Sequence, residues 1–197
     1  MAFSADSEVE VRATGDVDWE LLHEIKYQGK WQHFSVPIGV GTDFASVPTV
    51  FVWFLPKYGR YTKAAILHDY LWRHQVPAEG LTLPEADALF RRAMRELDVS
   101  FLRRWIMWSA VRLGALTKSG GRRRWLRDSW MVFPVALVAL PVIGPPAVLI
   151  LASLFLFHIL ELLFYVPLKL VASVKARRPQ APPPKEVNVP QLTLKLG

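Results

Sequence analysis

Cysteine is absent from the 197 residues of this chain. Without cysteine the protein can form neither a disulfide framework nor a thiolate metal site. A chain of this length must therefore rely on an apolar core, and it has room for a domain of about 120 residues with an appendage. The absence of cysteine also fits a reducing compartment.

Charged side chains are missing from Met131 to Leu160, a run of thirty residues that points to a membrane. The sequence Gly144-Pro145-Pro146 divides this apolar region into two legs. The first leg, Met131–Ile143, would be about 20 Å long as a helix, too short to cross a hydrocarbon core of about 30 Å. The second leg, Ala147–Leu168, has twenty-two residues with Glu161 as its one charged side chain, and it is long enough to span.

Basic residues flank the apolar region on both sides. The basic residues before it lie between Arg122 and Arg127. Those at its end and after it are Lys169, Lys175, Arg177 and Arg178. Positive charge on both sides favours a hairpin that enters and leaves at the same, cytoplasmic face. The sequence therefore predicts a C-terminal membrane helical hairpin with Gly144-Pro145-Pro146 at its tip. A core helix of a soluble protein is the alternative.

Positive charge is concentrated just before this region. Residues 91–127 hold eleven Lys and Arg against two acids, a local balance of +9 within a net charge of +7. Such a block suits nucleic acid or an anionic membrane surface. Because no nucleic-acid recognition motif accompanies it, we expect a phospholipid membrane as partner and no specific nucleic acid. Residues 1–20 are acidic and lack an apolar run, so no secretory signal is expected there. The oligomeric state stays open.

Short alternating segments open the chain and predict a small antiparallel sheet. The expected strands are 9–12, 24–27, 30–34 and 36–40, with Gln28-Gly29 as a two-residue hairpin turn. A polar loop, Gly41–Pro48, interrupts the apolar sequence after them.

Three helices are predicted next. The first covers Tyr61–His74 with Thr62 as N-cap, and the second opens with a Thr82-x-x-Glu85 capping box. The third, Phe101–Thr117, places tryptophans beside Arg103, Arg104 and Arg112. It suits either a headgroup interface or a core-packed surface helix with a solvated basic face. The fold class is α+β, with four regions: a β lobe and polar loop (1–58), a helical lobe (59–120), a basic hinge and hairpin (121–175), and a disordered Pro-rich tail (176–197).

One imidazole and three carboxylates lie on consecutive elements of this plan. His68 and Asp69 are adjacent on one helix and point about 100° apart, so they serve different partners. We expect Asp69 to face Asp43 in the polar loop, where two carboxylates and loop carbonyls would form an oxygen cage suited to Ca²⁺. We expect His68 to face Asp87 on the second helix. A carboxylate holding one imidazole nitrogen leaves the other free to take a proton from water, which is the chemistry of metal-assisted ester hydrolysis.

Each of these residues also has a structural explanation. Asp87 sits in the first turn of a helix, where it interacts favourably with the helix dipole. Asp43 and Ser46 can cap turns. His68 can be a core histidine that donates to a backbone carbonyl.

Ala64–Trp72 followed by Asp87–Met94 resembles the two core helices of bacterial and fungal phospholipase A2, and Thr42–Pro48 is similar in placement to the calcium loop of that family. The resemblance covers about a third of the chain. It implies His68 as general base and Asp87 as its orienting partner. It also implies calcium ligation by Asp43, the Phe44 carbonyl and Asp69.

Residues 36–97 also resemble an uncharacterised family of phage and prophage proteins. Its features are a Thr-Asp-x-Ala-Ser-Val-Pro loop, a His-Asp-Tyr helix and an Ala-Asp-x-x-Phe helix. Two functions follow as expectations: a membrane-anchored, calcium-dependent phospholipid esterase, or a non-enzymatic membrane-anchored protein of phage assembly, infection or lysis in which the His/Asp cluster is structural.

Overall fold

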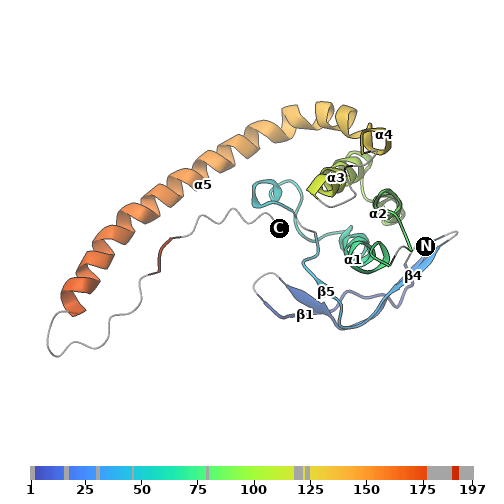
Figure 1. Ribbon diagram of the computed structural model, residues 1–197, viewed down its shortest axis with the longest axis horizontal. Helices are drawn as coiled ribbons and strands as arrows, with labels where there is room; N and C mark the ends of the chain where they lie inside the picture. The colour runs from blue at the N-terminus through green and yellow to red at the C-terminus, as the bar shows by residue number, and fades with distance from the viewer. Residues whose placement is uncertain are drawn as a thin grey trace.

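The computed structural model describes residues 3–15, 18–29, 32–45, 47–78, 80–117, 122, 125–176 and 188–190. The predictions for Ser46, for the hinge at Ser119–Gly121 and for nearly all of the Pro-rich tail fall outside these residues. The remainder is an α+β protein with two small antiparallel sheets, a group of short helices and one long C-terminal helix (Figure 1).

The strands form two separate sheets instead of one. Strands β1 (Val11–Ala13), β2 (Trp19–Leu21) and β5 (Gly41–Thr42) make an antiparallel sheet in the order β1-β2-β5. Strands β3 (Ile25–Gln28) and β4 (His33–Val36) form an antiparallel hairpin.

The expected two-residue turn at Gln28-Gly29 is wrong. Gln28 is the last residue of β3 and pairs with His33, so the connection runs from Gly29 to Gln32. The Gly29 N–H donates to the Gln32 carbonyl at 2.9 Å. A Cβ at Gly29 would lie 2.8 Å from the Tyr27 ring and 3.0 Å from the Gln32 carbonyl. Glycine is therefore needed here for close packing.

The helices follow the predicted order. They are η1 (Thr49–Phe51), α1 (Thr62–Tyr70), the π-helical turn η2 (Leu71–Gln75), α2 (Leu83–Glu96), α3 (Phe101–Gly114), η3 (Ala115–Thr117) and α4 (Trp125–Ser129). The capping box of α2 is confirmed, because the Thr82 N–H donates to the Glu85 carboxylate at 2.8 Å. Thr62 is the first helical residue of α1 and not its N-cap, and its hydroxyl donates to the Gly59 carbonyl at 2.8 Å.

The apolar core lies around α1. Ala64, Ala65, Ile66 and Leu67 are all buried, because α1 is enclosed by the β3–β4 hairpin on one side and by α2 on another. Helix α3 in turn packs on α2. This enclosure brings the middle of α1 against the first turns of α2.

The apolar C-terminal region forms one helix, α5 (Val132–Ala176), and the expected hairpin is absent from these residues. Gly144-Pro145-Pro146, the expected tip, lies inside the helix. Proline's fixed φ of about −65° is itself helical, so a proline can remove one backbone hydrogen bond and bend a helix without reversing it. The helix curves as a long arch away from the domain (Figure 1).

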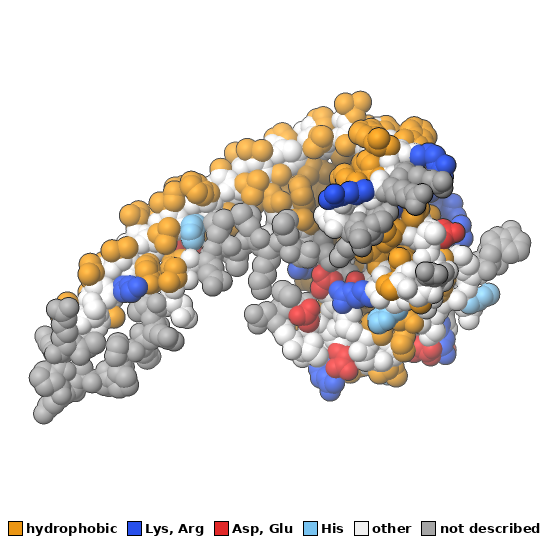
Figure 2. Space-filling view, in the orientation of Figure 1, with side chains coloured by type: hydrophobic (Ala, Val, Ile, Leu, Met, Phe, Trp, Pro, Cys, Tyr) orange, Lys and Arg blue, Asp and Glu red, His pale blue; other side chains and the backbone are white. Residues whose placement is uncertain are grey.

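Helix α5 has two parts with different surroundings. Val132, Ile143 and Ala147 are buried, and this first part packs on α3 and η1. From Val148 onward the apolar side chains are mostly exposed, and they cover the arch in Figure 2. By length and composition α5 can cross a membrane: its apolar segment Val132–Val174 has 43 residues and contains an 18-residue stretch with a mean hydropathy of 2.5.

Candidate active site

The His68 and Asp87 side chains meet between α1 and α2. His68 Nε2 lies 2.7 Å from Asp87 Oδ1, and the two side chains are 12% and 0% exposed. The predicted pairing of these two residues is therefore present in the structure. Phe90, one turn after Asp87, packs on the imidazole with ring centroids 4.8 Å apart. The ring is thus fixed by a hydrogen bond at its edge and by an aromatic contact.

The two nitrogens of His68 have different environments. An ionised carboxylate can only accept hydrogen bonds, so Nε2 must donate to Asp87, and in the neutral imidazole the lone pair is then on Nδ1. Among the described residues none hydrogen-bonds to Nδ1. The ring is oriented as a base whose accepting nitrogen is unengaged.

Asp87 binds two more donors besides His68. The indole Nε1 of Trp72 donates to Oδ1 at 3.1 Å, and Nη1 of Arg112 donates to Oδ2 at 2.7 Å. Trp72 lies one turn after His68 on the same face, within the π-helical turn η2. Three elements therefore converge on one buried carboxylate. The dipole-favouring role expected for Asp87 does not account for these contacts.

The position of Arg112 differs from the expectation that it lies on the basic face of the third helix. Its side chain is 2% exposed and is paired with Asp87. Its Nε also donates to Ser129 Oγ at 2.7 Å, and its carbonyl accepts from Trp125 Nε1 at 2.5 Å. A buried charge requires a partner, and Asp87 supplies one. The spacing of Trp108 and Arg112, one turn apart, was the signal that they share the buried face.

The Asp69 carboxylate interacts electrostatically with Asp43 in the polar loop. Its Oδ1 pairs with Arg73 Nε at 2.9 Å, while its Oδ2 is buried with no hydrogen-bond partner among the described residues. Burial raises the pKa of Asp69; Arg73 partly opposes this, and the nearby carboxylate of Asp43 adds to it. The expected approach of Asp43 and Asp69 thus appears as an electrostatic interaction between two carboxylates.

Phe44 has an unusual backbone conformation next to Asp43. Its φ is +64°, in the left-handed region that non-glycine residues rarely adopt. Its N–H donates to Thr42 Oγ1 at 3.0 Å, and its ring contacts Trp19 at 5.8 Å. The backbone and the side chain of this strained residue are therefore both held by contacts.

The residues around Asp69 fit calcium in part. Two carboxylates, one with an unsatisfied buried oxygen, are the hard oxygen donors that Ca²⁺ prefers. No group of three or more acidic or histidine side chains suited to a metal occurs in the described part of the chain, so the other ligands would be carbonyls and water. Asp43, the Phe44 carbonyl and Asp69 would hold the ion. Arg73 would compete with it for Asp69.

Residues 19–111 of this chain match a protein family described as "Protein of unknown function (DUF1353)". The match covers a little under half of the chain and contains β2 to α2 and most of α3. It includes His68, Asp69 and Asp87, and ends one residue before Arg112. Neither a curated protein nor a solved structure gives a significant match.

Proposed function

We propose that this chain is a membrane-anchored, calcium-dependent phospholipid esterase. The observation that carries the proposal is the 2.7 Å contact of His68 Nε2 with buried Asp87, which leaves Nδ1 to accept a proton. The neighbouring Asp69, with its unsatisfied buried oxygen, is one residue along the same helix. A base and a cation site would thus lie side by side.

In the proposed reaction His68 Nδ1 accepts a proton from a water whose oxygen attacks the ester carbonyl carbon. The carbon–oxygen bond to the alcohol then breaks, and the alkoxide takes the proton from Nδ1. Asp87 orients the ring and stabilises the imidazolium that forms in between. Arg112 and Trp72 position Asp87 through its two oxygens. The chemistry that calcium would supply at Asp43 and Asp69 is polarisation of the ester carbonyl.

Helix α5 supports an anchoring role in this proposal. From Val148 to Leu168 it carries twenty-one residues, about 31 Å of helix, which matches a hydrocarbon core of about 30 Å. The basic residues that precede α5 favour a cytoplasmic location for the domain. A phospholipid ester lies just below the headgroups, so an enzyme held at the surface has its substrate close by.

A second candidate is a non-enzymatic membrane-anchored protein of phage or prophage type, acting in assembly, infection or lysis. The favouring observation is that Asp87 is 0% exposed and bonded by His68, Trp72 and Arg112, as a structural network would be. In this case the network holds α1, α2 and α3 together, and its chemistry is incidental.

The test is phospholipid hydrolysis by the full chain in liposomes with and without calcium. We expect calcium-dependent release of fatty acid, lowered at least a hundredfold in His68→Asn, because general-base catalysis typically contributes 10²–10⁴-fold. His74→Asn is the matched control, since His74 is exposed and does not contact Asp87. A wild-type protein without hydrolysis would favour the non-enzymatic candidate, whereas equal rates of hydrolysis in the two variants would exclude His68 as the general base.

A further inference from the structure

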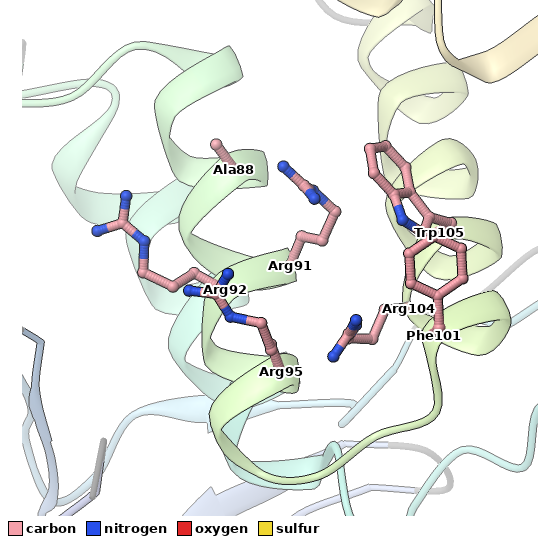
Figure 3. Close-up of a pocket in the computed structure, with 7 residues that line it drawn as sticks. All are labelled: Ala88, Arg91, Arg92, Arg95, Phe101, Arg104 and Trp105. Carbon is pink, nitrogen blue, oxygen red and sulfur yellow. The ribbon is translucent and has the colours of Figure 1, made fainter.

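A hollow between α2 and α3 is lined almost entirely by arginines and aromatic rings. Its volume is about 330 Å³. In Figure 3, Arg91 and Arg104 reach into the space between the helices from opposite sides, and the Phe101 and Trp105 rings form one wall. The full lining is Ala88, Arg91, Arg92, Arg95, Phe101, Arg104 and Trp105.

The positive charge in this pocket is not neutralised by the protein. No carboxylate lines it, and within the described residues its arginines form no ion pair. This contrasts with Arg112, which lies on the same two-helix interface and is paired with Asp87. Burial lowers the pKa of Arg91, and the charges of Arg95, Arg104 and Arg92 lower it further. The Nε of Arg91 is buried without a hydrogen-bond partner among these residues. An anion in the pocket would offset the repulsion among the arginines and could accept a hydrogen bond from the Arg91 Nε.

The guanidinium groups are positioned by the aromatic wall. Arg91 lies 4.1 Å from the centre of the Trp105 ring, and Arg104 lies 5.7 Å from that of Phe101. Stacking of this kind holds the planar guanidinium group and leaves its N–H edges available. Those edges match the paired oxygens of a phosphate. The rings also offer an apolar surface, because Phe101 is 68% exposed.

The position of α3 indicates where such a phosphate comes from. Helix α3 contributes three residues to the pocket and also packs against α5. Its 14 residues span about 21 Å, so the pocket lies within one helix length of the apolar helix. Exposed Phe101 and Leu102 begin α3 and would suit the apolar side of a headgroup region.

We propose that this pocket binds the phosphate of an anionic phospholipid, at a site separate from His68 and Asp87. Arg91 and Arg104 hold the phosphate oxygens, Arg92 and Arg95 add positive charge, and Phe101 and Trp105 contact the adjoining apolar part of the lipid. The site orients the domain on the membrane and takes no part in hydrolysis.

The test is calorimetric titration of the full chain in nonionic detergent, with EDTA present so that calcium and the proposed hydrolysis have no influence. The ligands are dihexanoyl phosphatidylglycerol, dihexanoyl phosphatidylcholine, inorganic phosphate and a short single-stranded oligonucleotide. The double variant Arg91→Gln/Arg104→Gln removes two pocket charges. The control Arg60→Gln/Arg103→Gln removes two exposed charges outside the pocket. Ala88→Phe fills the pocket and keeps every charge.

We expect saturable binding of phosphatidylglycerol that is at least tenfold tighter than binding of the other three ligands. The Arg91/Arg104 variant and Ala88→Phe should each weaken it at least tenfold, and the control less than twofold. Equal affinity for phosphatidylcholine would overturn the proposal, as would tighter binding of free phosphate or of the oligonucleotide. So would full binding by Ala88→Phe, because the interaction would then be a general surface attraction.

Discussion

At the scale of single residues, the main feature of the protein is the buried carboxylate of Asp87. This carboxylate has no contact with solvent and bonds to side chains from three other elements, α1, η2 and α3. A buried ion pair adds little net stability compared with an apolar pair, but breaking it by removing one partner is costly. The contacts of Asp87 therefore decide whether α1, α2 and α3 can pack together at all.

Removing this carboxylate should destabilise the fold strongly. In Asp87→Ala the Arg112 guanidinium stays buried without its partner, and we expect a loss of about 3–5 kcal/mol in the free energy of unfolding. Urea denaturation of the full chain in mild detergent, followed by tryptophan fluorescence, measures it. Asp6→Ala is the control, since Asp6 is exposed and its side chain forms no hydrogen bond or ion pair among the described residues. A change below about 1 kcal/mol in Asp87→Ala would contradict the network's structural role.

The raised pKa of Asp69 makes a separate prediction about pH. An acid whose pKa is higher in the folded than in the unfolded protein lowers stability once it ionises, and this cost disappears as the pH falls below the ordinary value of about 3.9. Without calcium, Asp69→Asn should therefore be at least as stable as the wild type at pH 7, despite loss of the exposed Arg73 pair. The difference should shrink as the pH is lowered through the raised pKa toward 3.9.

The same variant tests the cation site. Calcium should raise the wild-type melting temperature and leave Asp69→Asn unchanged, because binding to the folded state alone stabilises it. Thermal unfolding at pH 7 and pH 4, each with calcium or EDTA, tests both the pH prediction and the calcium prediction. An Asp69→Asn protein that calcium still stabilises would exclude Asp69 as a ligand.

At the scale of elements α5 is the unusual feature. Its first turns are part of the domain's packing, whereas from Val148 onward it has almost no protein contacts to cover its apolar side chains. Exposed apolar surface of this extent indicates a membrane or another apolar partner. Before Val148 only a few side chains of α5 pack on the domain, and the apolar side chains after it are free to contact a membrane.

Removing only the exposed C-terminal part of α5 should release the protein from membranes. We expect a chain lacking residues 150–176 to leave the membrane fraction in 1 M salt, because any remaining attraction through arginines is screened at high ionic strength. A chain lacking residues 177–197 keeps α5 and serves as the control. Membrane flotation assays separate the bound and free forms. Retention of the 150–176 deletion in high salt would assign the anchor to another surface.

At the scale of the whole molecule, the absence of a hairpin changes the expected topology. A hairpin would place both ends of the chain on one side of the membrane, whereas one continuous helix that crosses the membrane would place them on opposite sides. The domain lies before α5 and the C-terminal residues after it. In such a crossing the basic residues before α5 favour a domain on the cytoplasmic side, so we expect the residues after α5 to lie across the bilayer.

The lack of native cysteine makes this topology directly testable. We expect a membrane-impermeant maleimide to label Gly197→Cys in intact cells, while Asp6→Cys reacts only after lysis. Each single-cysteine chain is the control for the other, because both react fully in detergent. Labelling of neither position before lysis would contradict a single membrane crossing by α5.

The sequence by itself determined the local features of this protein. The α2 capping box, the α+β order of elements and the apolar character of the C-terminal region follow from spacing within one or two turns or from a long uncharged run. Such features depend on near neighbours and on composition. They hold whatever the rest of the chain does. The pairing of His68 with Asp87 was also expected, but it joins two helices and depends on their packing.

Only the tertiary structure decided which side of a helix is covered. Arg112 looks like its exposed neighbours in sequence, yet it is buried because α2 places Asp87 opposite it. The prolines of α5 permit either a turn or a bent helix, and the packing of its first turns on α3 and η1 accompanies the continuous form. The arginine pocket likewise exists only because α2 and α3 bring two separate basic segments together. Contacts between residues distant in sequence are set by packing, which no local pattern records.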